Sequence, residues 1–125
     1  MIKAVMFDSK PYDRESFDKA VGDDISLTYY ETKLDRTTVG LADGYDVVIV
    51  FVNDVVDGEV IKKLCSYGVK LIALRCAGFN NVDIKSAFEK IHVVRVPAYS
   101  PYAVAEHTMA LLLTSVRRIH KAYNR

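Results

Sequence analysis

The sequence has few cysteines and no long apolar run. Its two cysteines, Cys65 and Cys76, are too few for a disulfide framework and lack the CxxC spacing of a metal or redox motif. No apolar run approaches the roughly 20 residues that span a bilayer. The first residues, Met-Ile-Lys, show no signal-peptide pattern. These absences predict a protein of the reducing cytoplasm that is not part of a membrane.

The chain also has almost no net charge. Seventeen basic and sixteen acidic side chains give a formal charge of +1, so the overall field favours neither nucleic acid nor an anionic membrane surface. Basic residues do gather near the C-terminus, but cations in the last turns of a helix suit the helix dipole and usually form a solvated face. They are Arg117, Arg118, His120, Lys121 and Arg125. We therefore expect a small molecule or a protein as partner, and no nucleic acid.

Five short runs rich in β-branched residues alternate with helix-like stretches. The runs are Ala4–Phe7, Ile25–Tyr29, Val47–Val52, Lys70–Leu74 and His92–Val96. The third run is apolar without alternation, as expected of a central parallel strand covered by helices on both faces. A chain of 125 residues is long enough for one domain of common size. The pattern predicts an α/β fold with a five-stranded, mostly parallel sheet flanked by helices.

Helical segments are expected between these runs and after the last one. They are Glu15–Val21, a short turn or helix near Thr37–Ala42, Gly58–Tyr67 with Gly68 as its stop, Ile84–Glu89, and a last helix with Ser100 as N-cap and Pro101 as its first residue. The last helix is apolar on most of its circumference, which is typical of a helix with protein on several sides.

Ligands of open parallel sheets bind at the carboxyl ends of the strands. In this sequence the third run is followed by Asn53 and Asp54, the fourth by residues 75–81 and the fifth by residues 97–100. Gly78 would let the backbone approach a ligand closely, and the N–H groups of a tight turn can cradle an anion such as a carboxylate. The same glycine could merely supply a turn with positive φ, and the spacing alone leaves both interpretations open.

Four segments together resemble a known family. They are residues 72–83 (IALRCAGFNNVD), 93–101 (VVRVPAYSP), 103–107 (AVAEH) and 117–123 (RRIHKAY). These segments resemble the NAD-dependent D-lactate dehydrogenases of the D-isomer-specific 2-hydroxyacid dehydrogenase family, and residues 51–54 (FVND) are similar to the lactate branch. The resemblance covers the whole chain, more loosely before Gly44.

The resemblance implies a flavodoxin-like substrate domain over residues 1–99 and a crossing helix over residues 100–125 that leads toward an NAD-binding Rossmann domain. The 125 residues contain no G-x-G-x-x-G fingerprint, so we expect the Rossmann domain to be absent and this sequence to be the front part of a longer, truncated enzyme. The family's catalytic arginine, histidine and carboxylate belong to the later region, so no catalytic residue is assigned. His92, His107 and His120 do not replace them.

The resemblance does transfer several binding residues. The backbone amides of Gly78 and Phe79 correspond to the loop that holds the substrate carboxylate. Phe51 corresponds to an aromatic wall of the side-chain pocket, which would favour the methyl group of pyruvate, although it could simply pack in the core. Tyr99 corresponds to a tyrosine whose hydroxyl reaches the substrate, or it only packs at a hinge. Val104 corresponds weakly to a contact with the nicotinamide, and helix packing is the alternative.

Two further positions invite a functional interpretation. Arg75 could place positive charge near an anionic substrate, but an arginine at a strand end is more often a hinge residue or a member of a surface ion pair. Glu106 and His107 are adjacent, and adjacent helical residues point in different directions. We interpret that pair as structural.

The resemblance implies that the natural protein reduces pyruvate to D-lactate with NADH, and that this chain alone is inactive. Its partners would be a small 2-oxo or 2-hydroxy acid and the remainder of the dehydrogenase. Two alternatives stay open. One is a receiver-like signalling module, prompted by Asp8 and Asp54 at strand ends but lacking a lysine after the fifth strand. The other is a stand-alone assembly domain that associates through its apolar last helix, which would give a homo-oligomer.

Overall fold

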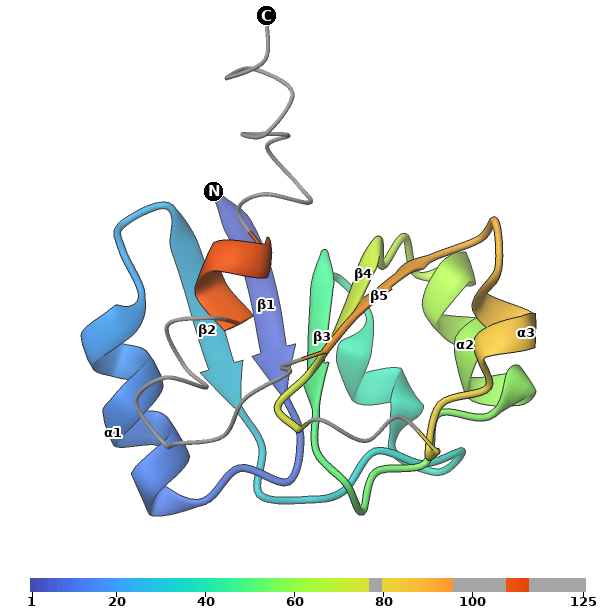
Figure 1. Cartoon of the computed structure of the whole chain (residues 1–125), viewed down its shortest axis with the longest axis horizontal. Helices are drawn as coiled ribbons and strands as arrows, with labels where there is room; N and C mark the ends of the chain where they lie inside the picture. Colours follow the sequence, from blue (N-terminus) through green and yellow to red (C-terminus); the bar gives the residue numbers. More distant parts are fainter. Residues whose placement is uncertain (77–79, 96–107, 113–125) are drawn as a thin grey trace, which may run out of the picture.

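A computed structural model of the 125-residue chain describes residues 1–76, 80–95 and 108–112. These residues form alternating strands and helices in the order expected of a βαβ fold (Figure 1). The strands are β1 (Ile2–Met6), β2 (Ile25–Tyr29), β3 (Val47–Val50), β4 (Leu71–Leu74) and β5 (His92–Val94), and the helices are α1 (Pro11–Ala20), the 3-10 helix η1 (Val39–Ala42), α2 (Gly58–Ser66) and α3 (Ile84–Ala87). Residues 108–112 add a further short piece of α-helix.

The five strands make one sheet in the order β2-β1-β3-β4-β5, and every paired strand runs parallel to its neighbour. This is the order of flavodoxin-like folds. The central strand β3 is buried throughout and pairs with β1 on one side and β4 on the other, with Val47 beside Leu71. The predicted five-stranded, parallel α/β architecture is confirmed.

Alternate residues along the strands feed two cores, one on each face of the sheet. On one face Val48 and Ile72 pack with residues of η1, α2 and α3. On the other face Ile49 packs with Phe17 of α1 and with Met109 and Leu112. Figure 1 shows α1 and the 108–112 segment on one side of the sheet and α2 and α3 on the other.

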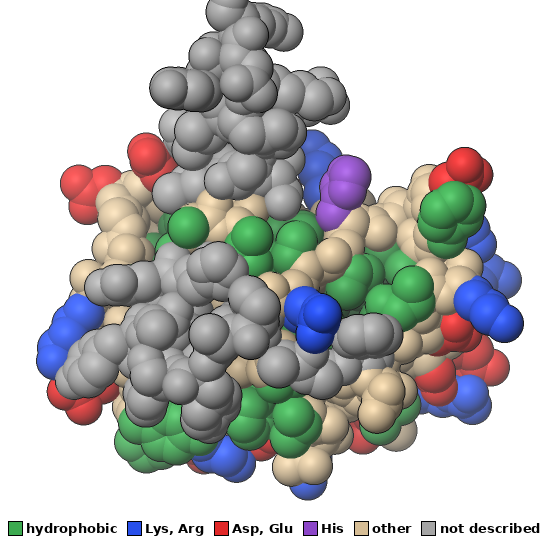
Figure 2. Space-filling model, in the orientation of Figure 1, with side chains coloured by type: hydrophobic (Ala, Val, Ile, Leu, Met, Phe, Trp, Pro, Cys, Tyr) green, Lys and Arg blue, Asp and Glu red, His purple; other side chains and the backbone are tan. Residues whose placement is uncertain are grey.

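The 108–112 segment tests the expectation that the apolar last helix is covered by protein. Met109 and Leu112 are buried against the sheet, whereas Ala110 is exposed. In Figure 2 hydrophobic side chains lie near the middle of the face shown, and most of the charged side chains that are coloured lie toward its margins. The expectation is therefore confirmed for one face of these five residues. The predicted start at Ser100 and Pro101 lies outside the described residues.

Most element boundaries agree with the sequence, and the differences have local causes. Helix α2 ends at Ser66, and Gly68 follows with a φ of 84°, the left-handed conformation that stops helices. Helix α1 begins at Pro11, four residues before the predicted start, because proline suits the first helical position and Asp13 accepts from the backbone N–H of Lys10. Helix α3 is shorter than expected and ends at Ala87.

Strand β3 also ends earlier than predicted, at Val50 instead of Val52. The chain leaves the sheet at Phe51 because the side chain of Asp54 accepts hydrogen bonds from two backbone N–H groups and folds the segment into a turn. This early exit from the strand places Phe51 in the loop at the carboxyl edge of the sheet.

Candidate substrate site at the carboxyl edge of the sheet

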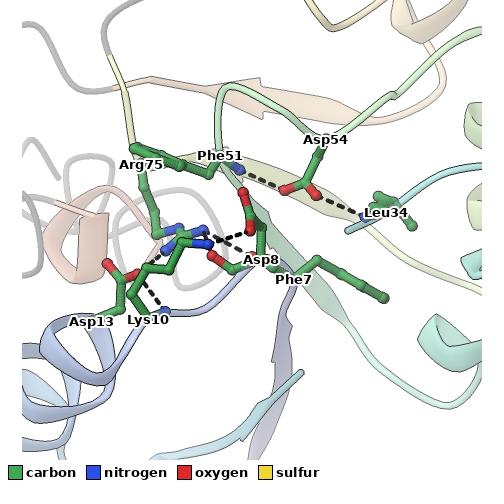
Figure 3. A network of polar contacts seen from close by, with 8 residues as sticks. All are labelled: Phe7, Asp8, Lys10, Asp13, Leu34, Phe51, Asp54 and Arg75. Carbon is green, nitrogen blue, oxygen red and sulfur yellow. Dashed lines mark hydrogen bonds and ion pairs between the residues drawn. The ribbon is translucent and has the colours of Figure 1, made fainter. Parts of the chain in front are cut away.

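The carboxyl ends of β1, β3 and β4 meet in one polar network (Figure 3). The strands bring it together because they are adjacent and parallel, so the residue after each strand comes to the same edge. The contributing residues are Phe7, Asp8, Lys10 and Asp13 after β1, Leu34 in the loop after β2, Phe51 and Asp54 after β3, and Arg75 after β4. The sequence predicts a site at this edge of the sheet, and the network lies at the same edge.

Arg75 is the centre of the network. Its side chain is only 1% exposed. Nη2 donates to the carbonyl oxygens of Phe7, at 2.8 Å, and Asp8, at 2.9 Å. Nη1 lies 2.5 Å from Oδ2 of Asp13 in an ion pair, although it is not aligned for a hydrogen bond. The guanidinium of β4 is thus attached to the turn after β1 and to the first turn of α1.

The Arg75 guanidinium lies over an aromatic ring. Its central carbon is 4.8 Å from the centroid of the Phe51 ring, which is within the range of a cation–π contact. Burying a guanidinium is costly unless its charge is compensated. Here two carbonyls, the Asp13 carboxylate and the Phe51 ring share that compensation. The sequence allowed a surface ion pair at Arg75, and this interpretation is wrong because the side chain is buried.

The turn after β1 carries an aspartate in an uncommon backbone conformation. Asp8 has a φ of 51°, in the left-handed region that aspartate tolerates better than most residues. Its carboxylate is buried, and Oδ1 pairs with Nζ of Lys10 at 2.9 Å. This contact raises the pKa of Lys10 through the hydrogen bond and the charge of Asp8. Oδ2 of Asp8 has no hydrogen-bond partner among the described residues.

The turn after β3 is held by a second buried aspartate. The carboxylate of Asp54 accepts from the N–H of Leu34 and from the N–H of Phe51, both at 2.7 Å. The pKa of Asp54 is raised because its burial disfavours the charged form, an effect that the two N–H groups oppose. Asn81 completes the turn, since its Nδ2 donates to the carbonyls of Phe51 and Asp54, each at 2.9 Å.

These contacts fix Phe51 from three directions. Its N–H is bound by Asp54, its carbonyl by Asn81, and its ring lies against Arg75. The side chain remains half-buried and packs partly against the core. Phe51 therefore lies at the predicted edge of the sheet. The sequence offered two interpretations of Phe51, a pocket wall and a core residue. Its position at the sheet edge is compatible with the first, and its partial packing against the core is compatible with the second.

The other predicted site residues lie outside the described residues. They are Gly78, Phe79, Tyr99 and Val104, together with the predicted boundary between residues 99 and 100. The described chain leads up to them, since Arg75 and Cys76 leave β4 beside Phe51. A hollow of about 290 Å³ also lies at the carboxyl ends of β4 and β5. Its described lining residues are Leu74, Ile84, Val93, Val94 and Arg95, and they do not include Phe51.

The described residues do not fit a dinucleotide. In Rossmann folds the turn after the first strand is rich in glycine, so that a pyrophosphate can approach the N-terminus of the following helix. Here that turn reads Asp8-Ser9-Lys10, without glycine, and the Asp13 carboxylate with its Arg75 partner occupies the start of α1. The cations at this turn, Lys10 and Arg75, are already paired with the carboxylates of Asp8 and Asp13, so no cofactor chemistry is assigned to these residues.

A receiver-like module is not supported either. In that hypothesis Asp54 would be free to accept a phosphoryl group beside a divalent cation. Instead both of its oxygens accept backbone hydrogen bonds, and the side chain is fully buried. Within residues 1–76, 80–95 and 108–112 there is no group of three or more side chains arranged to hold a metal ion.

Comparison with known proteins identifies relatives over the whole chain. Residues 4–124 match the family described as D-isomer specific 2-hydroxyacid dehydrogenase, catalytic domain. The chain is 52% identical over 127 residues to 2-hydroxyacid dehydrogenase homolog 1 of Schizosaccharomyces pombe, and 43% identical over 128 residues to D-lactate dehydrogenase of Escherichia coli. Each alignment covers 99% of this chain and 38% of the relative. The chain thus spans well under half the length of these curated relatives.

Solved structures agree with these relatives. The apo-structure of D-lactate dehydrogenase from Escherichia coli superimposes with a TM-score of 0.76 at 43% identity, covering 99% of this chain and 40% of that one. The Salmonella D-lactate dehydrogenase gives a TM-score of 0.76 at 44% identity and covers 99% and 38%. The part of the chain that the structure describes has no helix with the length and apolarity needed to cross a bilayer.

Proposed function

Since this chain belongs to the D-isomer specific 2-hydroxyacid dehydrogenase family, we propose that the protein reduces pyruvate to D-lactate, with NADH as the hydride donor. A relative named D-lactate dehydrogenase, at 43% identity over 99% of the chain, supports the choice of reaction within the family. A neighbouring structure described as an NAD complexed form supports the choice of cofactor.

The observation that carries the choice of substrate is the position of Phe51. It lies at the carboxyl edge of the sheet, next to the segment that follows β4, and its backbone and ring are both held by neighbours. A fixed aromatic ring at this place would leave room for a methyl group and exclude longer side chains. In this proposal Phe51 is the wall that selects pyruvate over larger 2-oxo acids.

The remaining contacts with the substrate are assigned to residues outside the described part of the chain. The backbone amides of Gly78 and Phe79 would bind the substrate carboxylate, and the hydroxyl of Tyr99 would reach the substrate. Val104 would touch the nicotinamide. Residues 1–99 would form the substrate domain, and residues 100–125 the helix that crosses to the cofactor domain.

Hydride transfer needs a bound cofactor and a proton donor. The described residues provide neither a dinucleotide cradle nor an assigned acid or base. We therefore propose that the 125 residues bind and orient the substrate and are not sufficient for turnover. The remainder of the dehydrogenase would be their main partner, and association into a homo-oligomer and a cytoplasmic location stay predictions.

The experiment is a spectrophotometric assay of the purified natural gene product. Addition of pyruvate should cause oxidation of NADH, and the product should be D-lactate when analysed with a chiral column. The 125-residue chain, purified in the same way, should show no pyruvate-dependent oxidation. L-lactate as product, or no turnover of any 2-oxo acid by the natural protein, would refute the proposed function. Turnover by the 125-residue chain would refute the proposal that these residues are not sufficient for activity, and it would leave the proposed reaction intact.

A further inference from the structure

We propose that Arg75 is a positioning residue that fixes the ring of Phe51 and thereby limits the size of the substrate side chain. This inference rests on the proposed function, in which Phe51 is the wall of the substrate pocket. Arg75 does not act by touching the substrate, because its side chain is 1% exposed. It acts through the ring against which its guanidinium lies.

The first step of the argument is that Arg75 is itself immobile. Nη2 is bound to two backbone carbonyls, those of Phe7 and Asp8, at 2.8 and 2.9 Å. Backbone carbonyls just beyond a buried strand move little, because the sheet fixes them. The ion pair with Asp13 holds the other terminal nitrogen against the first turn of α1. The guanidinium plane is thus attached to the sheet and to a helix at the same time.

The second step is that the ring is the part of Phe51 left to be fixed. Asp54 and Asn81 bind its backbone N–H and carbonyl, so the backbone is already anchored. A half-buried side chain could still rotate about its side-chain torsions. The guanidinium, whose central carbon lies 4.8 Å from the ring centroid, closes one side of that rotation. A cation–π contact with a desolvated guanidinium also favours this orientation energetically.

The third step concerns why arginine is needed. A lysine carries the same charge, but its ammonium is a point charge that cannot bind two carbonyls and present a flat face to a ring at once. Arg75→Lys would therefore keep the buried positive charge near Asp13 and lose the broad guanidinium group that lies over the Phe51 ring. The ring could then turn aside, and the pocket would admit a longer substrate side chain.

The test compares pyruvate with 2-oxobutyrate, which is longer by one methylene, in the natural full-length enzyme. Discrimination of one methylene in an apolar pocket is typically about 10-fold to 200-fold. We define the ratio as kcat/KM for pyruvate divided by kcat/KM for 2-oxobutyrate. We expect Arg75→Lys to lower this ratio by about threefold to tenfold, because part of that discrimination is lost. A merely structural role would lower the amount of active enzyme and leave the ratio unchanged.

The chain offers a matched control. Arg14, an exposed residue of α1, lies over the ring of Tyr29 with the same separation of 4.8 Å and has no contact with Phe51 among those described. Arg14→Lys removes a contact of the same kind and should leave the ratio unchanged. A second comparison uses Phe51→Leu, which removes the ring. In that background Arg75→Lys should change the ratio less than about twofold, because the surface on which Arg75 acts is gone.

Each outcome is decisive. An active Arg75→Lys enzyme with an unchanged ratio overturns the inference and leaves the proposed function intact, and so does an equal shift in the Phe51→Leu background. A natural enzyme that turns over neither 2-oxo acid overturns the proposed function and the inference with it. If Arg75→Lys does not fold, Asp13→Asn is the second variant. It removes the ion pair that holds the Arg75 guanidinium and keeps the arginine itself. The ratio should then fall in the same direction by a smaller factor, and an unchanged ratio overturns the inference.

Discussion

The turns after β1 and β3 each bury an aspartate, but they hold it in different ways. Asp8 pairs with the ammonium of Lys10 through one oxygen, and its other oxygen has no hydrogen-bond partner among the described residues. Asp54 uses both oxygens to accept from backbone N–H groups. Both aspartates are at most 1% exposed as whole residues. Burial alone therefore does not determine how a carboxylate is stabilised.

The difference shows that two kinds of interaction stabilise one edge of the sheet, namely buried ion pairs and hydrogen bonds from the main chain to a carboxylate. The turn after β1 is a balanced set of charges, with Lys10 and Arg75 against Asp8 and Asp13. The turn after β3 depends on hydrogen bonds between one carboxylate and the main chain. Phe51 lies where the two meet, since Asp54 holds its backbone and Arg75 its ring. Substitutions that remove only one of these kinds of interaction should show how much each turn contributes to the free energy of unfolding.

The largest effect is expected from breaking the charged turn. Arg75→Met keeps an unbranched side chain of similar length and removes the charge, which leaves the largely buried Asp13 carboxylate and two backbone carbonyls without their partner. Removing one member of a buried ion pair typically costs about 3 to 5 kcal/mol. We expect a loss of that order in the free energy of unfolding, measured with urea on the purified chain.

Arg36→Met is the control for this substitution. Arg36 is likewise in ion pairs, with the carboxylates of Asp57 and Glu59, but its side chain is 60% exposed. Exposed ion pairs contribute little because water screens them, so no change beyond replicate error is expected. An equal loss of unfolding free energy in both variants would mean that the burial of Arg75 does not increase the contribution of its ion pair to stability. The buried ion pairs after β1 would then not be a distinct source of stability.

A somewhat smaller effect is expected from breaking the hydrogen-bonded turn. Asp54→Ala leaves the N–H groups of Leu34 and Phe51 without an acceptor in the interior. Each unsatisfied buried donor costs about 1 to 3 kcal/mol. The N–H of Phe51 is only partly buried and costs less than that of Leu34, so the substitution should lower the free energy of unfolding by about 2 to 4 kcal/mol in the same urea measurement. Asp23→Ala, at an exposed aspartate before β2, is the control. A loss as small as that of the control would show that water replaces Asp54 without cost.

The sequence predicts the fold well because the sheet depends on local patterns. The unbroken apolar run at β3 indicates a central parallel strand, and Gly68 marks the end of α2. The start of α1 is missed because its first turn has little apolar character, and only Pro11 and Asp13 signal it. The early end of β3 is missed because the acceptor, Asp54, binds the N–H of Leu34, twenty positions away in the chain.

The site is predicted less completely. The strand-end rule places Phe51 and Arg75 at the same edge, and the structure brings them into contact. The sequence does not reveal that Arg75 is buried, because its acceptors are backbone carbonyls nearly seventy residues earlier, and any residue type could supply them. The one sequence signal that could have suggested it is the pair of acidic residues Asp8 and Asp13 beside β1, which a buried cation would balance.

The smallest effect, and the sharpest comparison, concerns pH. Burial raises the pKa of Asp54 in the folded protein, against the opposing effect of the N–H groups of Leu34 and Phe51. The folded state then binds the proton more readily than the unfolded state, so the contribution of Asp54 to stability falls as the pH rises from the ordinary aspartate pKa through the raised one. Asp54→Asn cannot titrate at this position. Its cost relative to wild type should therefore be greatest near about pH 4 and decrease toward about pH 7, measured by urea unfolding across that range. A cost that grows with pH would mean that the two N–H groups outweigh burial, and Asp54 would then be stabilised as an anion by its hydrogen bonds to the main chain.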